Sequence, residues 1–305
     1  MRSEENKRFG FVSVIGAPNA GKSTLLNALV GSKISIVSPK VQTTRAKVSG
    51  IVVRDDTQIV FVDTPGIFQP SKKNNLERAI VSAAWETVGE TDKIILLVDV
   101  SKKISNPVKE IIANLKENNV QNIILVLNKI DQIKRDKLLM ITQELNALYD
   151  FEATFMISAL KNDGVERVLD YIKTRLPLGV WHFSEDEMTD MPIRLLAAEI
   201  TREKLFKMMH QELPYNLTVE TEEWEPFEDG SVKIHQTIYI SREAHKRIIL
   251  GKGGEMLKKI GSMAREDLEE MMDRRVHLKL FVKVQENWMD DTNHFSMWNL
   301  NPNAA

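Results

Sequence analysis

The stretch GAPNAGKS, residues 16–23, follows the apolar run FGFVSVI and opens the helical pattern KSTLLNALV. It matches the phosphate-binding pattern G-x-x-x-x-G-K-[ST], which requires a strand before it and a helix after it. Gly16 and Gly21 allow a tight turn that aims backbone N–H groups at phosphates. Lys22 can place a cation on the β- and γ-phosphates, and Ser23 can offer a hydroxyl to Mg²⁺. The alternative is a plain glycine turn before a helix, which the strand and helix patterns on either side of the match disfavour.

Three more motifs follow, and each closes an apolar run: DTPG at 63–66, NKID at 128–131 and SA at 158–159. Ligands of open α/β sheets bind at the carboxyl ends of the strands, which is where these motifs stand. Asp63 is placed to hold Mg²⁺, and Gly66 can donate an N–H to the γ-phosphate. Asp131 can accept hydrogen bonds from guanine N1–H and the exocyclic amine, a donor pair that adenine lacks. The sequence therefore predicts a guanine-nucleotide site.

The predicted GTP-binding residues come from the glycine loop, the DTPG turn and the two base motifs. They are Gly16, Ala17, Pro18, Asn19, Ala20, Gly21, Lys22, Ser23, Thr24, Asp63, Thr64, Pro65, Gly66, Asn128, Lys129, Asp131, Ser158 and Ala159. Among them, Asn128 and the amide of Ala159 are expected on the O6 side of the base, and the stem of Lys129 is expected to pack on the ring.

Length and composition limit the classes of protein that fit. The 305 residues suit two domains, and 43% hydrophobic residues can build a core. The chain has no cysteine, which excludes disulfide scaffolds and thiolate zinc sites. Its apolar runs are of strand length, far below the ~20 residues of a membrane span. The net charge of −2 does not by itself indicate a nucleic-acid binder, but it conceals local asymmetry.

The first half alternates strand and helix patterns, which predicts an α/β P-loop GTPase domain with a mostly parallel six-stranded sheet. Two adjacent strands within residues 47–63 predict one antiparallel edge. The expected strands are 9–16, 46–53, 58–63, 93–100, 122–128 and 153–158, and the expected helices are 22–30, 75–89, 106–118, 135–149 and 164–175.

A break around residues 177–191, with prolines on either side of the acidic SEDEMTD, is interpreted as an interdomain linker. The predicted division is 1–176 for the GTPase domain, 177–191 for the linker, 192–288 for a second domain and 289–305 for a polar tail. The second domain shows helix 193–209, strands 216–224 and 232–241, helices 242–250 and 255–272, and strand 276–285. This α-β-β-α-α-β order predicts an α+β module, the topology of a type II KH fold.

The GKGG sequence at 251–254 lies between two helical patterns, and a GxxG loop in that position clamps about four nucleotides in KH domains. From Arg242 to Arg265 the chain carries seven cations and two anions, a local charge of +5, whereas residues 218–229 carry six acids and no base. A solvated helix face is the alternative for these cations. The predicted RNA-binding residues are Arg242, Lys246, Arg247, Ile248, Ile249, Gly251, Lys252, Gly253, Gly254 and Lys258, with Leu250 beside them.

The motifs GAPNAGKS, TTR, DTPG, NKID and SAL resemble those of Ras-like GTPases of the TrmE-Era-EngA-EngB-Septin-like class. The sequences GAPNAGKSTLLNAL and SPKVQTTR are similar to those of the Era family, bacterial GTPases with a C-terminal type II KH domain. The similarity covers nearly the whole chain. It implies Mg²⁺ as cofactor, held by Ser23, Thr44 and Asp63. It also implies binding to the 3′ region of 16S ribosomal RNA, in assembly of the 30S subunit and rRNA maturation.

The catalytic residues expected from the motifs and the resemblance are Lys22, Asn19, Thr44 and Gly66. Ile67 stands where Ras-type enzymes carry the glutamine that orients the attacking water, so hydrolysis should be slow. In related GTPases an asparagine at the place of Asn19 helps to hold K⁺, to which carbonyls of Ser38–Lys40 could contribute; a simple loop cap is the alternative. Thr44 is chosen over Thr43 by resemblance, and both could instead be ordinary β-formers.

Two other functions stay open at this point. One is an RNA-binding assembly chaperone in which hydrolysis is incidental, which the missing glutamine favours. The other is a signalling GTPase on the inner face of the cell membrane, although neither end carries a lipidation motif. The expected protein is cytoplasmic and monomeric, and peripheral membrane association remains an alternative.

Overall fold

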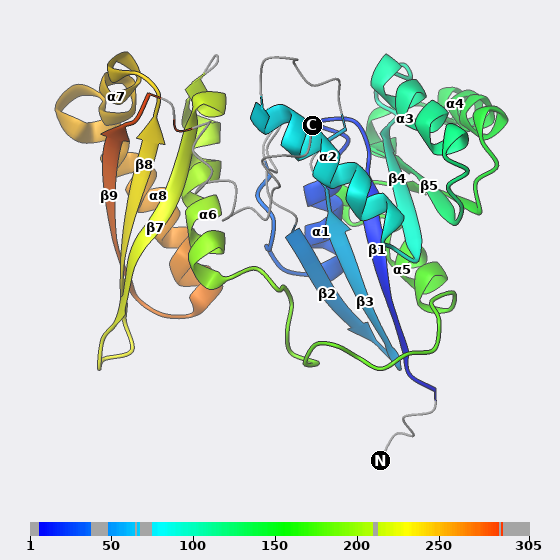
Figure 1. Ribbon diagram of the computed structural model, residues 1–305, viewed down its shortest axis with the longest axis horizontal. Helices are drawn as coiled ribbons and strands as arrows, with labels where there is room; N and C mark the ends of the chain where they lie inside the picture. Colours follow the sequence, from blue (N-terminus) through cyan, green and yellow to red (C-terminus); the bar gives the residue numbers. More distant parts are fainter. Residues whose placement is uncertain are drawn as a thin grey trace. The chain divides into compact units, whose positions relative to one another are not determined.

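The computed structural model describes residues 6–37, 48–64, 66–67, 75–209, 213–286 and 288. The described residues fall into two compact units, with 6–35 and those from 48 to 190 in the first, and 36–37 and those from 191 to 288 in the second. Each is described by itself below (Figure 1). Among the described residues, no helix combines the length and the apolar character that crossing a membrane demands.

The described part of the first unit contains a six-stranded sheet in the order β2-β3-β1-β4-β5-β6. Neighbouring strands are parallel except for the antiparallel edge pair β2–β3. This confirms the predicted sheet and its antiparallel edge. The strands are β1 (Arg8–Ile15), β2 (Val48–Arg54), β3 (Thr57–Asp63), β4 (Lys93–Asp99), β5 (Ile123–Asn128) and β6 (Ala153–Ile157).

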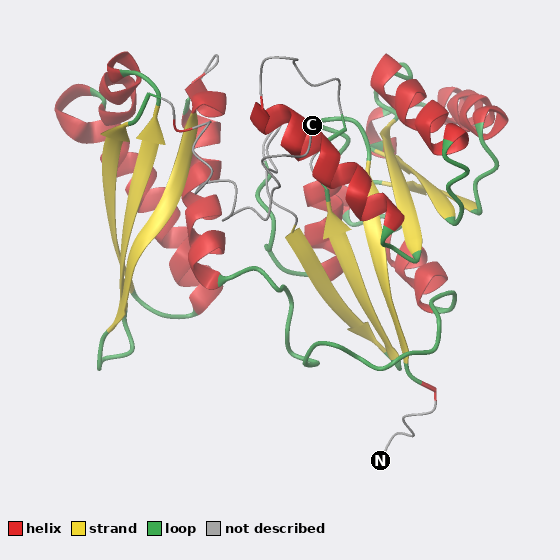
Figure 2. Ribbon diagram, in the orientation of Figure 1, coloured by secondary structure: helices red, strands yellow, loops and turns green. Residues whose placement is uncertain are grey.

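Helices cover both faces of this sheet (Figure 2). They are α1 (Lys22–Val30), α2 (Asn75–Gly89), α3 (Asn106–Glu117), α4 (Arg135–Leu148) and α5 (Val165–Lys173). One hydrophobic cluster joins α2, α3 and α4 to strands β4 and β5. Helices α1 and α5 lie on the other face, where they contact each other and β3. In addition, α1 contacts β2 and α5 contacts β6. Strands buried on both faces explain the unbroken apolar runs of β4 and β5 in the sequence.

Two glycines shape the turn between β1 and α1. Gly16 has φ +155°, and a Cβ there would lie 2.4 Å from the backbone oxygen of Leu97. Gly21 is the N-cap of α1 in the left-handed region at φ +101°, and a Cβ there would lie 2.5 Å from Nδ2 of Asn128. Only glycine permits this close approach of the loop to the ends of β4 and β5.

The segment expected to be a linker is bound along the first unit as far as Thr189. The N–H of Gly179 donates to the backbone oxygen of Lys7 (3.0 Å), and Trp181 Nε1 donates to that of Arg8 (3.0 Å). Gln58 donates to the oxygen of Phe183 (2.8 Å) and accepts from the N–H of the same residue (3.1 Å). The segment therefore runs as a strap, defined here as residues 177–190, along the strands β1, β3 and β2.

The second unit contains α6 (Ile193–Met208), β7 (Leu217–Pro226), β8 (Val232–Ile240), α7 (Glu243–Leu250), α8 (Glu255–Met272) and β9 (Val276–Val284). Its described three-stranded sheet has the order β7-β8-β9, antiparallel between β7 and β8 and parallel between β8 and β9. The predicted α-β-β-α-α-β order is confirmed. Helices α6, α7 and α8 pack on one face of the sheet, around a core that includes Leu205, Ile238 and Ile260.

Candidate functional site

The loop 16–23 wraps around the side chain of Lys22. Nζ of Lys22 donates to the backbone oxygens of Gly16 (3.1 Å) and Ala17 (3.3 Å). Burial lowers the pKa of Lys22 from 10.5 to about 8, although the charge of Asp63 acts in the opposite direction. A phosphate oxygen beside this buried amine would favour its charged form. The loop thus places a desolvated cation where the sequence predicts phosphates.

A carboxylate at the end of β3 accepts a hydrogen bond from the start of α1. Ser23 Oγ donates to Asp63 Oδ2 (2.8 Å), and Ser35 Oγ donates to the same oxygen (3.1 Å). A hydroxyl beside a carboxylate is an oxygen donor set that suits Mg²⁺. Ser35 was not among the predicted residues, and it stands close to the carboxylate through Asn27. The side chain of Asn27 accepts from the N–H of Ser35 (2.9 Å) and donates to its oxygen (2.7 Å).

The turn after Asp63 contacts the loop before α1. Oγ1 of Thr64 donates to the backbone oxygen of Val14 (2.9 Å), so this side chain fastens the turn to β1. A Cβ on Gly66 would lie 3.1 Å from Pro18. The N–H of Ile67 donates to the oxygen of Gly16 (3.2 Å), while its side chain is 6% exposed within the core cluster of α2, α3 and α4. Ile67 therefore packs inward.

Asn128, at the end of β5, binds three motifs together with one side chain. Its Nδ2 donates to the backbone oxygen of Ala20 (2.9 Å). Its Oδ1 accepts from the N–H groups of Lys129 (2.8 Å) and Ala159 (3.0 Å). The predicted contact of Asn128 with the base is thus joined by a positioning role, because its amide already holds the phosphate loop and both base motifs.

Lys129 links the base motif to the phosphate loop and to β4. Its Nζ donates to the backbone oxygen of Asn19 (2.8 Å) and to Asp99 Oδ2 (2.6 Å). Oδ1 of Asp99 accepts from the N–H of Ser101 (2.9 Å). Burial opposes ionisation of Asp99, but the hydrogen bonds from Lys129 and Ser101 outweigh it and hold the pKa of this carboxyl below its usual value.

The remaining base residues stand near this link. Asp131 lies in a short helical turn (Ile130–Gln132) that begins after Lys129, whose φ of +67° is left-handed. Its Oδ2 is 3.8 Å from Nζ of Lys161, which follows the second base motif. Ser158 is buried and closes β6, with its N–H donating to the oxygen of Asp163 (3.0 Å). The structure thus brings together the described residues of all four motifs.

Several predicted residues lie outside the described part of the chain. These are Thr43, Thr44, Ser38–Lys40, Pro65 and the tail 289–305. The predicted third Mg²⁺ ligand and the carbonyl contributors to a K⁺ site belong to this group and stay predictions.

The second unit presents the GKGG loop between α7 and α8 in a backbone conformation that favours glycine. Gly251, Gly253 and Gly254 all have positive φ, of 70°, 61° and 84°. A Cβ on Gly251 would lie 2.7 Å from that of Met256, whereas no atom lies within 4 Å of one on Gly253 or Gly254. The loop therefore offers open backbone on its outer side, with Lys252 exposed beside it. A polynucleotide backbone can approach closely there.

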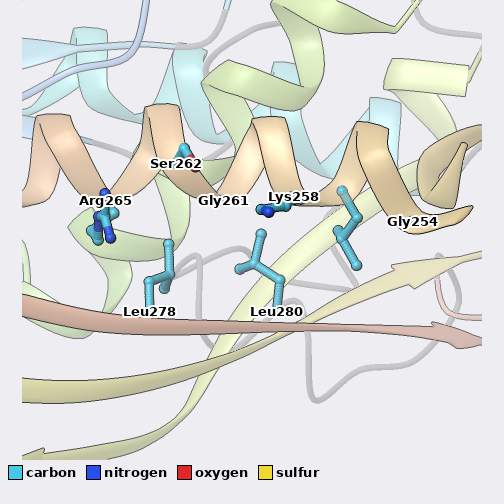
Figure 3. Close-up of a pocket in the computed structure, with 8 residues that line it drawn as sticks. Gly254, Lys258, Gly261, Ser262, Arg265, Leu278 and Leu280 are labelled. Carbon is cyan, nitrogen blue, oxygen red and sulfur yellow. The ribbon is translucent and has the colours of Figure 1, made fainter.

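A groove of about 420 Å³ continues from this loop between α8 and β9. Figure 3 shows Leu278 and Leu280 rising from β9 toward α8, where Lys258, Ser262 and Arg265 lie. Its apolar floor and cationic rim suit bases below and phosphates above. Of its lining residues, the predicted site contained Lys258 and Gly254. It did not contain Ser262, Leu278 or Leu280. No motif identifies these three residues, which become neighbours only when β9 lies beside α8.

One predicted RNA contact requires correction. Ile249 is 0% exposed and belongs to the core cluster of the second unit, so its side chain cannot meet a base. Its neighbour Ile248 is 55% exposed. The sequence prediction treated a run of three apolar residues as one surface, whereas the helix α7 turns each of them in a different direction.

Asp99 was also missed, although a signal for it exists. It closes the apolar run KIILLVD in the same way that Asp63 and Asn128 close theirs. A polar residue at the carboxyl end of a buried parallel strand is the common feature of all three.

Two family models match the chain. One, described as a 50S ribosome-binding GTPase, matches residues 11–129. The other, described as a KH domain, matches residues 212–289. They cover separate units of the structure.

Relatives and solved structures match the chain over almost its whole length. The GTPase Era of Sinorhizobium medicae is 54% identical over 288 residues, which is 94% of this chain and 92% of the relative. A crystal structure of an Aquifex aeolicus Era variant bound to GDP·AlF₄⁻ is 37% identical and covers 95% of this chain and 98% of its own, with a TM-score of 0.90. A crystal structure of Era with MgGDPNP and nucleotides 1506–1542 of 16S ribosomal RNA is 37% identical, covers 96% and 98%, and has a TM-score of 0.91.

Proposed function

We propose, from the premise that this chain belongs to the family of the GTPase Era, that it couples a GTP-dependent switch to binding of the 3′ region of 16S ribosomal RNA during 30S subunit assembly and rRNA maturation. The chain is a GTPase. We also propose that the GTPase domain extends through the strap to Asp190, that residues 192–288 form the RNA-binding domain, and that the protein acts in the cytoplasm, where the 30S subunit is assembled.

One observation carries the nucleotide assignment: the side chain of Asn128 bonds to Ala20, Lys129 and Ala159 at once. These bonds hold the phosphate loop and both base motifs in one assembly. A nucleotide that binds Lys22 through its phosphates can therefore reach Asp131 with its base. Asp131 selects guanine because a carboxylate accepts from two adjacent donors.

The chemistry is phosphoryl transfer from GTP to water. Lys22 would stabilise charge on the β- and γ-phosphates, and the N–H of Gly66 would donate to the γ-phosphate. Ser23 and Asp63 would hold Mg²⁺ together with Thr44, and Mg²⁺, when bound, neutralises charge between these phosphates. The side chain of Ile67 cannot orient water, since it is apolar and buried in the core. Hydrolysis is therefore slow, on the order of the intrinsic Ras rate of ~10⁻⁴ s⁻¹ or somewhat above it.

Asn19 supports a contribution of K⁺ to this reaction. Its backbone has a left-handed φ of 64° and its backbone oxygen accepts from Lys129, while the residue is exposed in the phosphate loop. A cation held there would offset charge that develops between the phosphates. Single-turnover hydrolysis in matched K⁺ and Na⁺ buffers tests this role. A faster rate in K⁺ that disappears in Asn19→Ala supports it, and equal rates in the two buffers exclude it.

The second unit binds RNA through the GKGG loop and the groove between α8 and β9. The open backbone at Gly253 and Gly254 accepts the phosphate chain, and Lys252, Lys258 and Arg265 supply its counter-charges. Binding of 16S ribosomal RNA nucleotides by the structural relative supports the 3′ region as the target.

Two experiments test the proposed function. Calorimetry with GDP and ADP in Mg²⁺ should show binding of GDP only; equal affinities would remove the nucleotide assignment. Crosslinking in cells followed by sequencing of the bound RNA should give a dominant peak at the 16S 3′ region. A dominant peak elsewhere would remove the RNA target and leave the GTPase intact.

The buried Ile67 also favours a second function, an RNA-binding assembly chaperone in which hydrolysis is incidental. The two functions differ in whether the nucleotide alters RNA affinity. RNA affinity measured with GDP and with a non-hydrolysable GTP analogue should differ for a switch and coincide for the chaperone.

A further inference from the structure

The outer face of the three-stranded sheet, opposite the helices, divides into an acidic and a basic side. Side chains alternate along a strand, and those of β9 that point away from the core are His277, Lys279, Phe281 and Lys283. In Figure 3 the intervening Leu278 and Leu280 point into the groove, so β9 presents one side to the groove and the other to this face. On β7 the outward side chains are glutamates, among them Glu223 and Glu225.

The glutamates of β7 engage the polar groups of the middle strand. Lys233 Nζ donates to Glu225 (3.0 Å), His235 Nδ1 lies 2.7 Å from Glu223, and Tyr239 donates to Glu222 (3.0 Å). In the described residues, neither Lys279 nor Lys283 takes part in an ion pair. The positive charge of this face is therefore concentrated on β9, at the edge of the sheet farthest from the acids.

Aromatic rings lie between these lysines. Phe281 is 53% exposed, and its ring meets His235 edge-on with 5.9 Å between centroids. Nζ of Lys283 lies 5.4 Å from the ring centre of Tyr239. This exposed ring in the middle of the strand is available for a base to stack on it. Lysines and aromatic rings alternating along a strand match the requirements of single-stranded nucleic acid, whose phosphates and bases also alternate.

We propose that the outer side of β9, formed by His277, Lys279, Phe281 and Lys283, is a second binding surface for single-stranded RNA, continuous with the groove. This inference rests on the proposed function, since the same RNA occupies the groove. A strand that leaves the groove crosses the free edge of β9 and stacks a base on Phe281, while Lys279 and Lys283 bind flanking phosphates. The acids of β7 repel phosphates and limit the surface to the β9 side.

The test compares two RNAs from the 16S 3′ region on the full-length protein. One has about four nucleotides, enough for the groove. The other has about twelve, extended at both ends, which lies within the range of single-strand site sizes. Wild type should bind the longer RNA more tightly than the shorter. Phe281→Ala should weaken the longer RNA by about tenfold and leave the shorter unchanged.

The lysines are tested by salt dependence. In the double variant Lys279→Gln/Lys283→Gln, the slope of log affinity against log salt for the longer RNA should fall by about 1.4, since each phosphate contact to a single strand contributes ~0.7. The matched control is Lys102→Gln/Lys103→Gln, which removes the same charge from exposed positions of the first unit and should leave the slope unchanged.

The outcomes separate this inference from the proposed function. Gly253→Asp in the GKGG loop should weaken both RNAs; if it weakens neither, RNA binding by the KH unit is wrong. If Gly253→Asp acts but the β9 variants keep wild-type affinity and salt slope for the longer RNA, the second surface is wrong and the groove stands. Tighter binding of an acidic peptide than of RNA, lost in the same β9 variants, would also overturn it.

Discussion

Nζ of Lys129 lies 2.6 Å from Oδ2 of Asp99, so an ion pair joins the end of β4 to the base-recognition loop. The same Nζ donates to the backbone of Asn19 in the phosphate loop. Asp99 thus orients a lysine of the proposed base motif that also bonds to the phosphate loop. It acts through Lys129 and is a positioning residue.

Asp99→Asn should therefore weaken guanine nucleotides. The change keeps the shape of the side chain and removes the charge that holds Lys129, a hydrogen bond to a charged group worth about 1.5–3 kcal/mol. We expect a loss of GDP affinity of about tenfold or more, seen mainly as faster dissociation of a fluorescent GDP analogue. Asp186→Asn, the same change in the exposed part of the strap, is the control and should have no effect.

The pH dependence of this effect follows from the lowered pKa of Asp99. A carboxyl whose folded-state pKa lies below the unfolded value contributes its full stabilising free energy above about pH 3.9. It loses this stabilisation as the pH falls through the folded pKa. The difference in affinity between wild type and Asp99→Asn should be constant from about pH 5 to pH 8. A difference that shrinks toward pH 5 would mean that the ion pair is not its source.

Nucleotide binding should take up a proton at Lys22 in mildly alkaline buffer. With a pKa of about 8 in the protein alone, Lys22 is mostly neutral at pH 8.5, and phosphates restore its charge. Calorimetry in buffers of different ionisation enthalpy should give a larger proton uptake at pH 8.5, above this pKa, than at pH 7, below it. Without nucleotide, the same depressed pKa makes the fold more stable as the pH rises from about 8 to 10.5. Equal uptake at both pH values would contradict a neutral lysine.

Asp131→Asn should change the base that is preferred. The carboxylate accepts from two donors of guanine, whereas an amide presents one acceptor and one donor, which matches the 2-oxo group of xanthine. We expect GDP affinity to fall by about a hundredfold and XDP to bind more tightly than GDP, both measured by calorimetry. Asp163→Asn, an exposed carboxylate near Ser158, is the matched control. Unchanged preference for guanine in Asp131→Asn would place base recognition elsewhere.

Ile67→Gln should not accelerate hydrolysis. A glutamine at this position would be buried in the core of the first unit and not directed at water near the γ-phosphate. Burying its amide costs about 1–3 kcal/mol. Thermal denaturation should therefore show a loss of stability, and single-turnover GTP hydrolysis should stay at the wild-type rate. Ile67→Leu, which keeps the apolar character, should alter neither quantity strongly, whereas a tenfold faster Ile67→Gln would mean that the side chain turns outward.

The order of strands and helices was predictable because local patterns determine it. Helix α1 begins at Lys22 and ends at Val30 as predicted, since glycines at 21 and 31 bracket an amphipathic run. The antiparallel edge β2–β3 was also predicted, because only a short turn separates its strands. The motif residues could be found because each closes an apolar strand.

Contacts between distant segments could not be predicted in this way. Ser35 meets Asp63 only after Asn27 has folded the chain back on itself, and nothing in the local sequence marks that bond. Leu278 and Leu280 become a groove floor only when β9 lies beside α8. Ile249 was wrongly placed on the surface because the direction of a side chain on a short helix depends on which face is packed.

The strap at residues 177–190 determines where the two halves of this protein can be severed. Its bonds satisfy backbone groups of Lys7, Arg8 and Ile51, and the side chain of Gln58 bonds to His182 and Phe183. A fragment truncated at residue 176 would expose these groups and would lose the segment that bonds to β1, β2 and β3. The GTPase half should therefore be separated from the RNA-binding half after Asp190, so that the isolated fragment keeps the strap.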